Sequence, residues 1–481
     1  MSSKGKPYYD VVLVQPSITW AYYPFEHLGL AYLTAALRRE GFTVKIVDAL
    51  LLRWSMADLY RELDQYRIGI LGVTLISHGY PTTVEFLRFY RERHPETRII
   101  AGGHFATFAA DKILAHTEVF DAIVLGEGEY SAVNYCRRIL RGVEVELTDV
   151  AMPGRTVRRS HDRIRDMDQL APPARDCLEL AISQGAIPSV TASRGCYARC
   201  AFCTVHNFYA ATSAPRWVAR SVDNVIAELY ELHRQYRIKH FMFVDDNFMG
   251  PGQMGRRRAL EFAAAYRKSQ LPMTFDIDCR AMDVCEEVIE ALRDVGLRSV
   301  FLGIESVSDR DLVAYRKGQK AETCWKAVRI LKKFRISYTI AMIMFNPETD
   351  EQSLLKNIEF LDWAGYYPRN PVSILNLYEG TELRDRYPDL IYGPFWDYRF
   401  HFARESVKII YEEAMKFCKK TLPFERDLPR RRDGEPTRRE LHRMRLFFLK
   451  DLTLNQGQGR ESPAEIRKRW DDRVDRLQRK E

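Results

Sequence analysis

The chain has 481 residues, of which 46% are hydrophobic and 12% aromatic, and this is typical of a globular protein with two or three domains. No apolar stretch is long enough to span a bilayer, and the first residues lack the apolar run of a signal peptide. The net charge of +8 lies mostly in residues 425–481, whereas a nucleic-acid partner would require a concentrated basic face in the core domains. We therefore expect a cytoplasmic protein that binds neither membranes nor nucleic acid.

The first part of the chain, residues 1–145, alternates short apolar runs with helical patterns. The runs lie at residues 10–16, 43–48, 69–74, 98–103 and 121–126. Five such strands separated by helices predict a doubly wound parallel sheet. Ligands bind beyond the carboxyl ends of the strands in such a sheet. The residues expected at these ends are Ser17, Thr74, Ser77, Gly102, Gly103, Gly126 and Glu127.

The rest of the chain predicts a linker, a barrel and a helical region. Residues 146–186 are rich in Arg, Asp and Pro and predict an extended linker. A second alternating series in residues 187–400 predicts a partial (β/α)6 barrel, whose catalytic groups come from the carboxyl ends of its strands. Its expected strands are residues 189–193, 240–244, 273–277, 299–304, 338–344 and 372–377. Residues 401–481 are charged and have helical spacing, which predicts a basic, helical C-terminal region.

Three cysteines, Cys196, Cys200 and Cys203, follow the first expected barrel strand directly. A Cys-x3-Cys-x2-Cys loop can place three thiolates on three irons of a [4Fe-4S] cluster and leave the fourth iron open. The alternative is a Cys3His zinc site that includes His206, although short zinc sites normally spread their ligands over two knuckles. The six other cysteines are scattered and predict ordinary small core residues.

This cysteine spacing, with the aromatic Phe202 before the third cysteine, resembles the radical S-adenosylmethionine (SAM) superfamily. The resemblance implies that the open iron chelates SAM and passes it one electron, which yields a 5'-deoxyadenosyl radical. Residues 303–306 resemble the fourth-strand motif of the superfamily, whose glutamate approaches the amino group of SAM. Residues 344–349 lack both glycines of the fifth-strand motif, which puts backbone contacts to the adenosyl group there in doubt. The resemblance implies SAM contacts from Phe202 (adenine), Arg280 (carboxylate), Gly303, Glu305 and Ser306.

The first 145 residues resemble the cobalamin-binding domain that precedes the barrel in one subgroup of this superfamily. Gly102 and Gly103 after the fourth strand, and the Gly-Glu-Gly-Glu run at residues 126–129 after the fifth, carry the resemblance. It implies cobalamin at the strand ends. Residues 48–53 lack the histidine of the Asp-x-His-x-x-Gly motif of mutases, so a cobalt there would have no such lower axial ligand. The alternative is a Rossmann-like domain that only packs or binds substrate.

Several acidic residues are expected at the ends of the barrel strands. Asp245 follows the second strand, and Asp276 and Asp278 share one side of the third by strand alternation. If that side faces the lumen, two roles are open to these candidate catalytic acids. They pair with Arg280 or a lysine, or they hold a hydroxylated or cationic substrate such as an amino sugar. The candidate proton or hydrogen-atom donors are Tyr209, Tyr315 and Tyr378.

We therefore predict a radical SAM enzyme that removes hydrogen from a small polar biosynthetic intermediate and methylates the carbon from methylcobalamin. One alternative is radical dehydration, oxidation or rearrangement of an aminoglycoside-type substrate without cobalamin, as in radical diol dehydratases that resemble this architecture. A non-enzymatic alternative is a zinc-bound scaffold. The expected cofactors are a [4Fe-4S] cluster, SAM and cobalamin. The expected protein partner is a flavodoxin- or ferredoxin-type electron donor, for which the basic C-terminal residues form either a docking surface or merely a solvated face.

Overall fold

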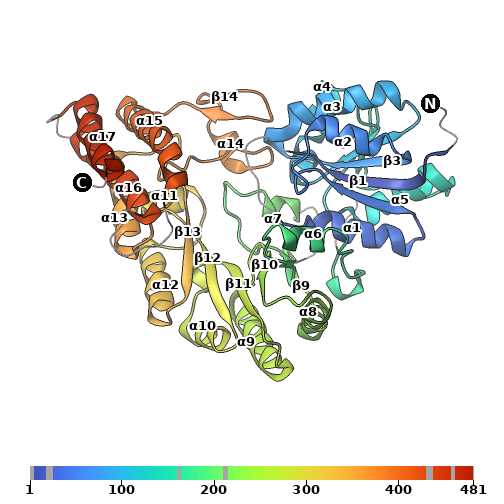
Figure 1. Ribbon diagram of the computed structural model, residues 1–481, viewed down its shortest axis with the longest axis horizontal. Helices are drawn as coiled ribbons and strands as arrows, with labels where there is room; N and C mark the ends of the chain where they lie inside the picture. Colours follow the sequence, from blue (N-terminus) through green and yellow to red (C-terminus); the bar gives the residue numbers. More distant parts are fainter. Residues whose placement is uncertain are drawn as a thin grey trace.

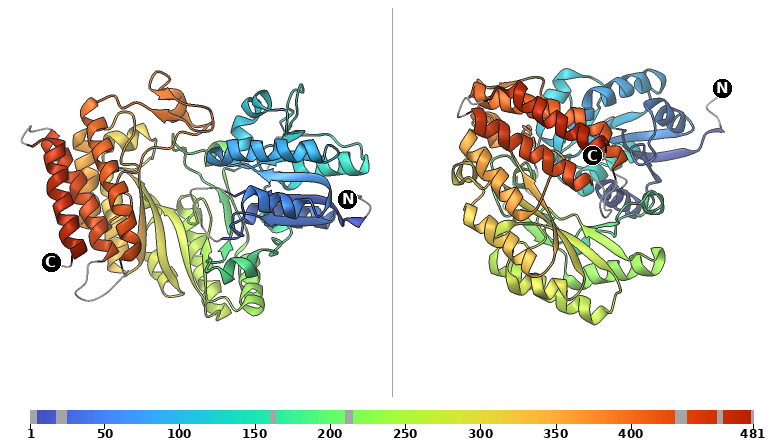
Figure 2. Two further views of the ribbon diagram at one scale, coloured as in Figure 1. Left: turned by 45° about the horizontal axis from the view of Figure 1, so that its top comes forward. Right: turned by 60° about the vertical axis from the view of Figure 1, so that its left-hand side comes forward.

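The computed structural model describes residues 5–17, 25–159, 164–209, 215–428, 437–456 and 461–479. Its N-terminal α/β unit and its C-terminal helices lie at opposite ends of the molecule, with a second α/β unit between them (Figures 1 and 2). Among the described residues, no helix has both the length and the apolar character needed to cross a bilayer.

The N-terminal sheet confirms the predicted doubly wound architecture. Its strands are rich in Val and Ile because helices bury both of its faces. Five parallel strands lie in the order β2-β1-β3-β4-β5. They are β1 (Tyr8–Gln15), β2 (Val44–Asp48), β3 (Arg67–Thr74), β4 (Arg98–Gly102) and β5 (Ala122–Val124).

Helices cover this sheet on both faces. Val11 and Leu13 of β1 belong to one core, together with α1 (Leu28–Arg39) and α5 (Gly128–Arg141). Val12 and Val14 belong to the other core. The helices on that face are α2 (Met56–Leu63), α3 (Tyr80–Arg93) and α4 (His104–His116), and the short helix η2 (Ser77–Gly79) precedes α3.

Residues 146–186 are more ordered than the extended linker that the sequence predicts. The short strand β6 (Val150–Ala151) pairs antiparallel with β5 and extends the N-terminal sheet, and η3 (Met167–Gln169) and α6 (Leu178–Ser183) follow. The buried Arg175 joins both units, because it contacts Glu26 at 2.5 Å and Glu228 of the barrel at 2.6 Å. Because these partners are distant from Arg175 in sequence, no local pattern reveals them. The sequence therefore predicts a segment that is less ordered than the observed one.

The second unit is a parallel sheet in the order β13-β12-β11-β10-β7. Its strands are β7 (Ser189–Val190), β10 (His240–Phe243), β11 (Thr274–Arg280), β12 (Leu297–Glu305) and β13 (Ser337–Met342). The sixth strand expected at residues 372–377 is reduced to two isolated bridges, a parallel one between Phe345 and Ile374 and an antiparallel one between Leu377 and Tyr398. The outer helices are α8 (Val222–Tyr236), α9 (Gly252–Ser269), α10 (Glu286–Arg293), α12 (Ala321–Lys333) and α13 (Glu351–Ala364).

Short elements at the carboxyl ends of the barrel strands build the region around the cysteines. Strand β8 (Ser193–Gly195) pairs antiparallel with β9 (Trp217–Ala219), and the cysteine loop lies between them. The other short elements are α7 (Val205–Phe208), η4 (Ala281–Asp283), α11 (Asp309–Ala314), α14 (Glu382–Arg386), β14 (Ile391–Tyr392) and β15 (Arg399–Phe400).

The C-terminal region is helical, as the sequence predicts. It contains α15 (Glu405–Asp427), α16 (Arg438–Gln456) and α17 (Pro463–Arg479). These helices pack on one another, and α16 also packs on α13, so they continue the outer helical layer at the β13 edge of the barrel (Figure 1). Phe417 and Leu449 belong to the same hydrophobic core as the barrel helices.

Candidate active site between two sheets

A cavity of about 320 Å³ lies where the carboxyl ends of the two parallel sheets face each other. Thr74 and Gly102 of the N-terminal unit line it on one side, and Thr191 and Arg194 of the barrel line it on the other. The carboxyl ends of the strands are the edge at which both α/β sheets and barrels bind ligands. Ligands of both units can therefore meet in one space.

The cysteine loop begins directly after β8 and is held against the barrel by backbone hydrogen bonds. The amide of Ala201 donates to the carbonyl of Tyr315 over 2.8 Å, and the amide of Cys203 donates to the carbonyl of Cys200 over 3.0 Å. The amide of Val205 donates to Cys203 Sγ over 3.4 Å. Burial raises the pKa of the Cys196 and Cys203 thiols, so iron binding must displace their protons.

The three-cysteine loop offers thiolates, which are the usual protein ligands of iron–sulfur clusters. Within the described residues, no group of three His, Cys, Asp or Glu side chains surrounds one point that could hold a metal ion. Tetrahedral zinc requires all of its ligands at about 2.0 to 2.3 Å from one centre. In a cluster, each of the three thiolates binds its own iron. The Cys3His alternative with His206 therefore has no support in this arrangement.

A buried ion pair lies beside the cysteine loop. Glu305 ends β12 with a left-handed φ of +70°, after a shift in the pairing of β12 with β13 between Gly303 and Glu305. Lys317, which is only 4% exposed, donates from Nζ to Glu305 Oε1 over 3.2 Å. The same Nζ lies 5.7 Å from the ring centre of Phe202. Lys317 could not be recognised from the sequence, because a single lysine in a loop carries no signal.

This pair offers one cation and one carboxylate to a ligand, as the α-amino acid group of SAM would require. Gly303 leaves space for it, since an added Cβ would lie 3.1 Å from Lys317 Nζ. Phe202 packs edge-on against Tyr315, with ring centres 5.7 Å apart. Tyr315 itself is buried, and its hydroxyl accepts a hydrogen bond from Asn346 over 2.7 Å, so it serves the core rather than the lumen.

Arg280 extends from the end of β11 to the cysteine loop. One terminal nitrogen donates to Cys200 Sγ over 3.4 Å, and the other donates to the carbonyl of Lys317. Its Nε is buried and has no hydrogen-bond partner among the described residues. The guanidinium thus has one free N–H on the side of the cluster loop.

Two of the predicted site residues are used inside the protein instead. Asp245 is 1% exposed and accepts hydrogen bonds from the Ala192 amide over 2.7 Å and from Ser193 Oγ over 2.6 Å. It therefore fixes the chain between β7 and β8. Ser306 is fully buried, and its hydroxyl contacts Asp311 over 3.0 Å and Asn357 over 3.1 Å. Both residues lie at strand ends, but their side chains turn into the core.

Asp276 and Asp278 lie on the partly exposed side of β11, whereas the alternate residues Phe275 and Ile277 belong to the core. Asp276 contacts His240 Nε2 over 3.1 Å. Among the described residues, no donor or cation pairs with Asp278. Burial, followed by repulsion from neighbouring aspartates, raises the pKa of Asp278 to about 7. Its protonation therefore changes near neutral pH.

Most of the expected cobalamin-side residues meet at the cavity. Thr74, Gly102, Gly103, Gly126 and Glu127 line it. Gly103 and Gly126 have left-handed φ values of +99° and +66°, which glycine adopts without strain. Ser77 lines an adjoining cavity of about 350 Å³ that shares Thr74 and Gly103. Ser17 is half-buried at the end of β1 and is not among the lining residues.

The inner part of the cavity lies between the N-terminal sheet and helices α1 and α5, and its walls are apolar. Gly72 and Gly102 remove side chains that would otherwise fill this space. The lining side chains here are Leu13, Leu33, Ile100, Val124 and Ala132. An elongated apolar group can therefore enter the N-terminal unit beside the sheet.

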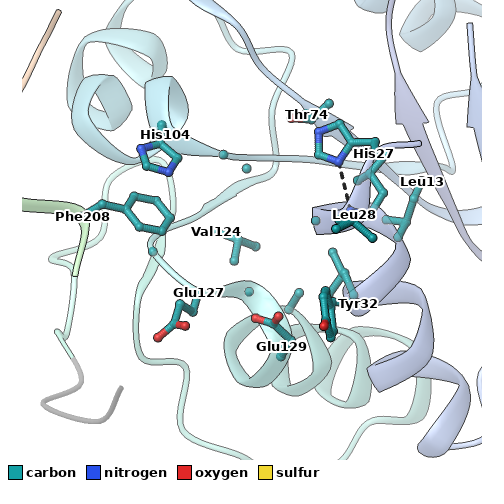
Figure 3. A pocket seen from close by; sticks show the side chains of 18 of the residues that line it. Leu13, His27, Leu28, Tyr32, Thr74, His104, Val124, Glu127, Glu129 and Phe208 are labelled. Atoms are coloured by element: carbon teal, nitrogen blue, oxygen red, sulfur yellow. Dashed lines mark hydrogen bonds between the residues drawn. The ribbon is translucent and has the colours of Figure 1, made fainter. Parts of the chain in front are cut away.

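Two histidines of the N-terminal unit, His27 and His104, line the cavity. His27 caps α1, and its Nδ1 accepts a hydrogen bond from the Leu30 amide over 3.1 Å (Figure 3). His104 stacks on Phe208 with ring centres 3.9 Å apart, and burial lowers its pKa to about 4. Phe208 and Tyr209 follow the cysteine loop, so this wall joins the two units. His104 and Phe208 are distant in sequence, so no local pattern reveals that their rings stack.

Arg194 links the two units at the mouth of the cavity. It contacts Glu127 at 3.1 Å and Glu129 at 2.7 Å, and its guanidinium lies 4.9 Å from the ring centre of Tyr32. All three charged side chains are at most 13% exposed. Because Arg194 precedes Cys196 by two residues, these contacts set the position of the cysteine loop relative to the N-terminal sheet.

We expect Arg194→Met to destabilise the protein by about 3 kcal/mol, because it leaves two buried carboxylates without their cation. Urea unfolding of the protein purified without oxygen measures this change. Arg61→Met is the matched control, since Arg61 is 75% exposed in its pair with Asp58 and should contribute about 0.5 kcal/mol or less. Equal effects of the two substitutions would contradict the role assigned to Arg194.

The fold and the site define a two-unit α/β protein in which a three-cysteine loop faces a glycine-lined Rossmann-type sheet. Family comparison gives the same division. Residues 190–358 match the model of the radical SAM superfamily, and residues 18–135 match the model of the B12 binding domain. The chain therefore belongs to the radical SAM enzymes that carry a cobalamin-binding domain before the barrel. The cofactors expected from the sequence are a [4Fe-4S] cluster, SAM and cobalamin, and these are the cofactors of a radical SAM domain and a B12 binding domain.

Two curated relatives are similar to this chain over about three quarters of its length. An uncharacterized methyltransferase of Pyrococcus horikoshii is 27% identical over 368 residues, which cover 74% of this chain and 77% of the relative. The hopanoid C-3 methylase of Methylococcus capsulatus is 26% identical over 395 residues, which cover 77% of this chain and 71% of the relative. The solved structure of the cobalamin-dependent SAM radical enzyme OxsB, with aqua-cobalamin and SAM bound, superposes with a TM-score of 0.81 at 16% identity. That superposition covers 99% of this chain and 80% of OxsB.

Proposed function

We propose that this protein methylates an unactivated carbon of a small polar molecule, using a 5'-deoxyadenosyl radical and methylcobalamin. The observation that carries the proposal is that the carboxyl ends of the two sheets share one cavity, which begins beside the cysteine loop and enters the N-terminal sheet. The methylating activity in the names of both curated relatives supports this choice. When bound, the cluster supplies the electron that cleaves SAM, and methylcobalamin supplies the methyl group.

The residues beside the cysteine loop are proposed to hold SAM. Cys196, Cys200 and Cys203 bind three irons and leave the fourth for the amino and carboxylate groups of SAM. Glu305 accepts from the ammonium, and the free Nε–H of Arg280 and the ammonium of Lys317 face the carboxylate. The methionine part of SAM would then separate the buried pair of Glu305 and Lys317.

The glycine-lined end of the N-terminal sheet is proposed to hold cobalamin. The dimethylbenzimidazole base of its nucleotide tail is apolar and would enter the inner part of the cavity beside Gly72 and Gly102. The sheet ends together with His104 and Phe208 would hold the corrin ring at the mouth of the cavity. The Nδ1 of His27 is already used to cap α1, so His27 stays neutral and its Nε2 carries the proton.

The acidic side of β11 is proposed to orient the substrate. Asp278 has no protein partner among the described residues and lies with Asp276 on the partly exposed side of β11, so it can accept a hydrogen bond from a hydroxyl or ammonium group. Ionised Asp278 also attracts a cationic substrate, and its pKa of about 7 makes this attraction stronger as the pH rises through neutrality. A flavodoxin or ferredoxin in a reducing cytoplasm is the proposed source of the electron.

The experiment is anaerobic turnover with SAM that carries a deuterated methyl group. Protein reconstituted with iron, sulfide and cobalamin is incubated with a reductant and candidate amino sugars or amino acid derivatives. We expect 5'-deoxyadenosine and S-adenosylhomocysteine to form together, and a product heavier by one deuterated methyl group by mass spectrometry.

Two results would overturn the proposed methylation. Full turnover by protein that contains no corrinoid would favour the alternative of dehydration, oxidation or rearrangement. A product that retains the carbon count of the substrate, formed without S-adenosylhomocysteine, would lead to the same conclusion. The measurement therefore separates the two reaction types even when both begin with the same radical.

A further inference from the structure

The contact between Arg280 and the cysteine loop has a function beyond holding SAM. Arg280 is 6% exposed, and one of its terminal nitrogens lies 3.4 Å from Cys200 Sγ in hydrogen-bond geometry. Its other terminal nitrogen donates to the carbonyl of Lys317 and contacts Met282 Sδ at 3.3 Å. The guanidinium is therefore anchored on both sides before any ligand arrives.

A second layer of side chains holds this guanidinium in place. The ring of Tyr197, in the cysteine loop, lies 5.4 Å from the guanidinium carbon. The Tyr197 hydroxyl donates to Asp283 over 2.5 Å, and Asn247, beyond the end of β10, donates to the same carboxylate over 2.9 Å. The cysteine loop and two barrel strands thus converge on Arg280. These contacts restrict the movement of the guanidinium relative to Cys200.

A permanent cation that donates to a cluster ligand changes the redox chemistry of the cluster. Reduction adds one negative charge, which the thiolates share, and a charge-assisted N–H···S hydrogen bond stabilises that charge. Arginine remains protonated at all relevant pH values, so this stabilisation does not vary with pH. Outer-sphere hydrogen bonds of this kind tune metal centres generally.

We propose that Arg280 is a positioning residue that raises the reduction potential of the cluster through its hydrogen bond to Cys200. This inference rests on the proposed cluster, but not on the identity of the substrate or on methyl transfer. Because the contact exists without SAM, its effect on the potential is present in the enzyme before SAM binds.

The test is a redox titration of the reconstituted holoenzyme without SAM, followed by electron paramagnetic resonance of the reduced cluster. We expect Arg280→Gln to lower the ratio of reduced to oxidised cluster about tenfold at a fixed potential, which equals about 59 mV for one electron. Arg280→Lys keeps the charge and should give a smaller fall. The matched control is Arg199→Gln, because Arg199 is exposed and adjoins Cys200 in sequence without a hydrogen bond to its sulfur among the described contacts.

Three results would overturn the proposal. The first is that Arg280→Gln contains full iron and sulfide and its cluster has an unchanged reduction potential. An equal fall in Arg199→Gln is the second, since it would assign the effect to charge alone. A third measurement uses the wild-type protein and so does not depend on whether a variant folds. It records electron spin echo modulation of the reduced cluster in protein that contains ¹⁵N-labelled arginine. We expect a weak ¹⁵N coupling that Arg199→Gln retains, and its absence in the wild type would contradict the contact. A wild-type protein that forms no cluster would instead refute the proposed function.

Discussion

Replacing any one of Cys196, Cys200 and Cys203 by alanine is expected to abolish reductive cleavage of SAM. The rate of 5'-deoxyadenosine formation should fall at least about a thousandfold, which corresponds to about 4 kcal/mol in activation free energy. The physical reason is that three thiolates hold three irons, so the loss of one leaves an iron without its protein ligand and the cluster unstable. Iron and sulfide content and absorbance near 400 nm after anaerobic reconstitution measure the loss.

Cys285→Ser is the matched control for these substitutions. Cys285 is a free cysteine at the start of α10, outside the cysteine loop, and serine is nearly isosteric with it. We expect this variant to retain its iron, sulfide and SAM cleavage. If the three loop variants kept a full cluster, or if Cys285→Ser lost it equally, the assignment of the cluster to the loop would be wrong.

Filling the cavity at Gly102 is expected to remove cobalamin while leaving the cluster intact. Gly102 ends β4 with ordinary strand geometry, and an added Cβ would lie 3.7 Å from its nearest neighbour, the carbonyl of Val124. Gly102→Ala therefore fits without strain. Gly102→Leu adds three further carbons that must occupy the space of the ligand, and overpacking of this kind costs about 1 to 3 kcal/mol. We expect corrinoid affinity to fall about tenfold or more, since 1.4 kcal/mol is tenfold.

Corrinoid absorbance after gel filtration and the rate of 5'-deoxyadenosine formation are the two measurements for this pair. Gly102→Leu should lose corrinoid and methyl transfer but keep SAM cleavage, whereas Gly102→Ala should resemble the wild type. Retention of stoichiometric corrinoid by Gly102→Leu would place cobalamin elsewhere. Loss of the cluster as well would show that the substitution disturbs the fold, and Gly102→Ala would then carry the comparison.

The proposed methyl transfer depends on one architectural fact, namely that two parallel sheets present their carboxyl ends to the same cavity. Each unit alone would expose an incomplete site, with the cysteine loop on one and the glycine-lined strand ends on the other. Arg194 and the stack of His104 on Phe208 cross the boundary and hold these two halves together. The orientation of the units is therefore part of the active site.

The amino-acid sequence predicted those features that follow from local periodicity and spacing. The five-strand N-terminal sheet could be predicted because buried parallel strands are continuous apolar runs between helical patterns. The cysteine loop could be recognised because its three ligands lie within eight residues. The sixth barrel strand could not be placed correctly, since the run at residues 372–377 makes only two isolated bridges in the tertiary structure, to Phe345 and to Tyr398.

Which side chains face the cavity was decided only by tertiary packing. Asp245 and Ser306 occupy the expected strand ends, yet contacts with Ala192 and Asn357 turn them inward. Lys317 and Arg194 gain their significance from partners that lie 12 and 65 or more residues away. A one-dimensional pattern specifies the period of burial but not which distant group satisfies a buried charge.

The sequence by itself determined that this chain combines a parallel sheet, a barrel and a thiolate loop for a cluster, because strand runs and clustered ligands are local. The tertiary structure decided that Arg280 reaches Cys200, that Lys317 pairs with Glu305, and that the apolar cavity enters the N-terminal sheet. These features depend on the direction of side chains across the space between strands, and that direction is fixed only when the two units pack together.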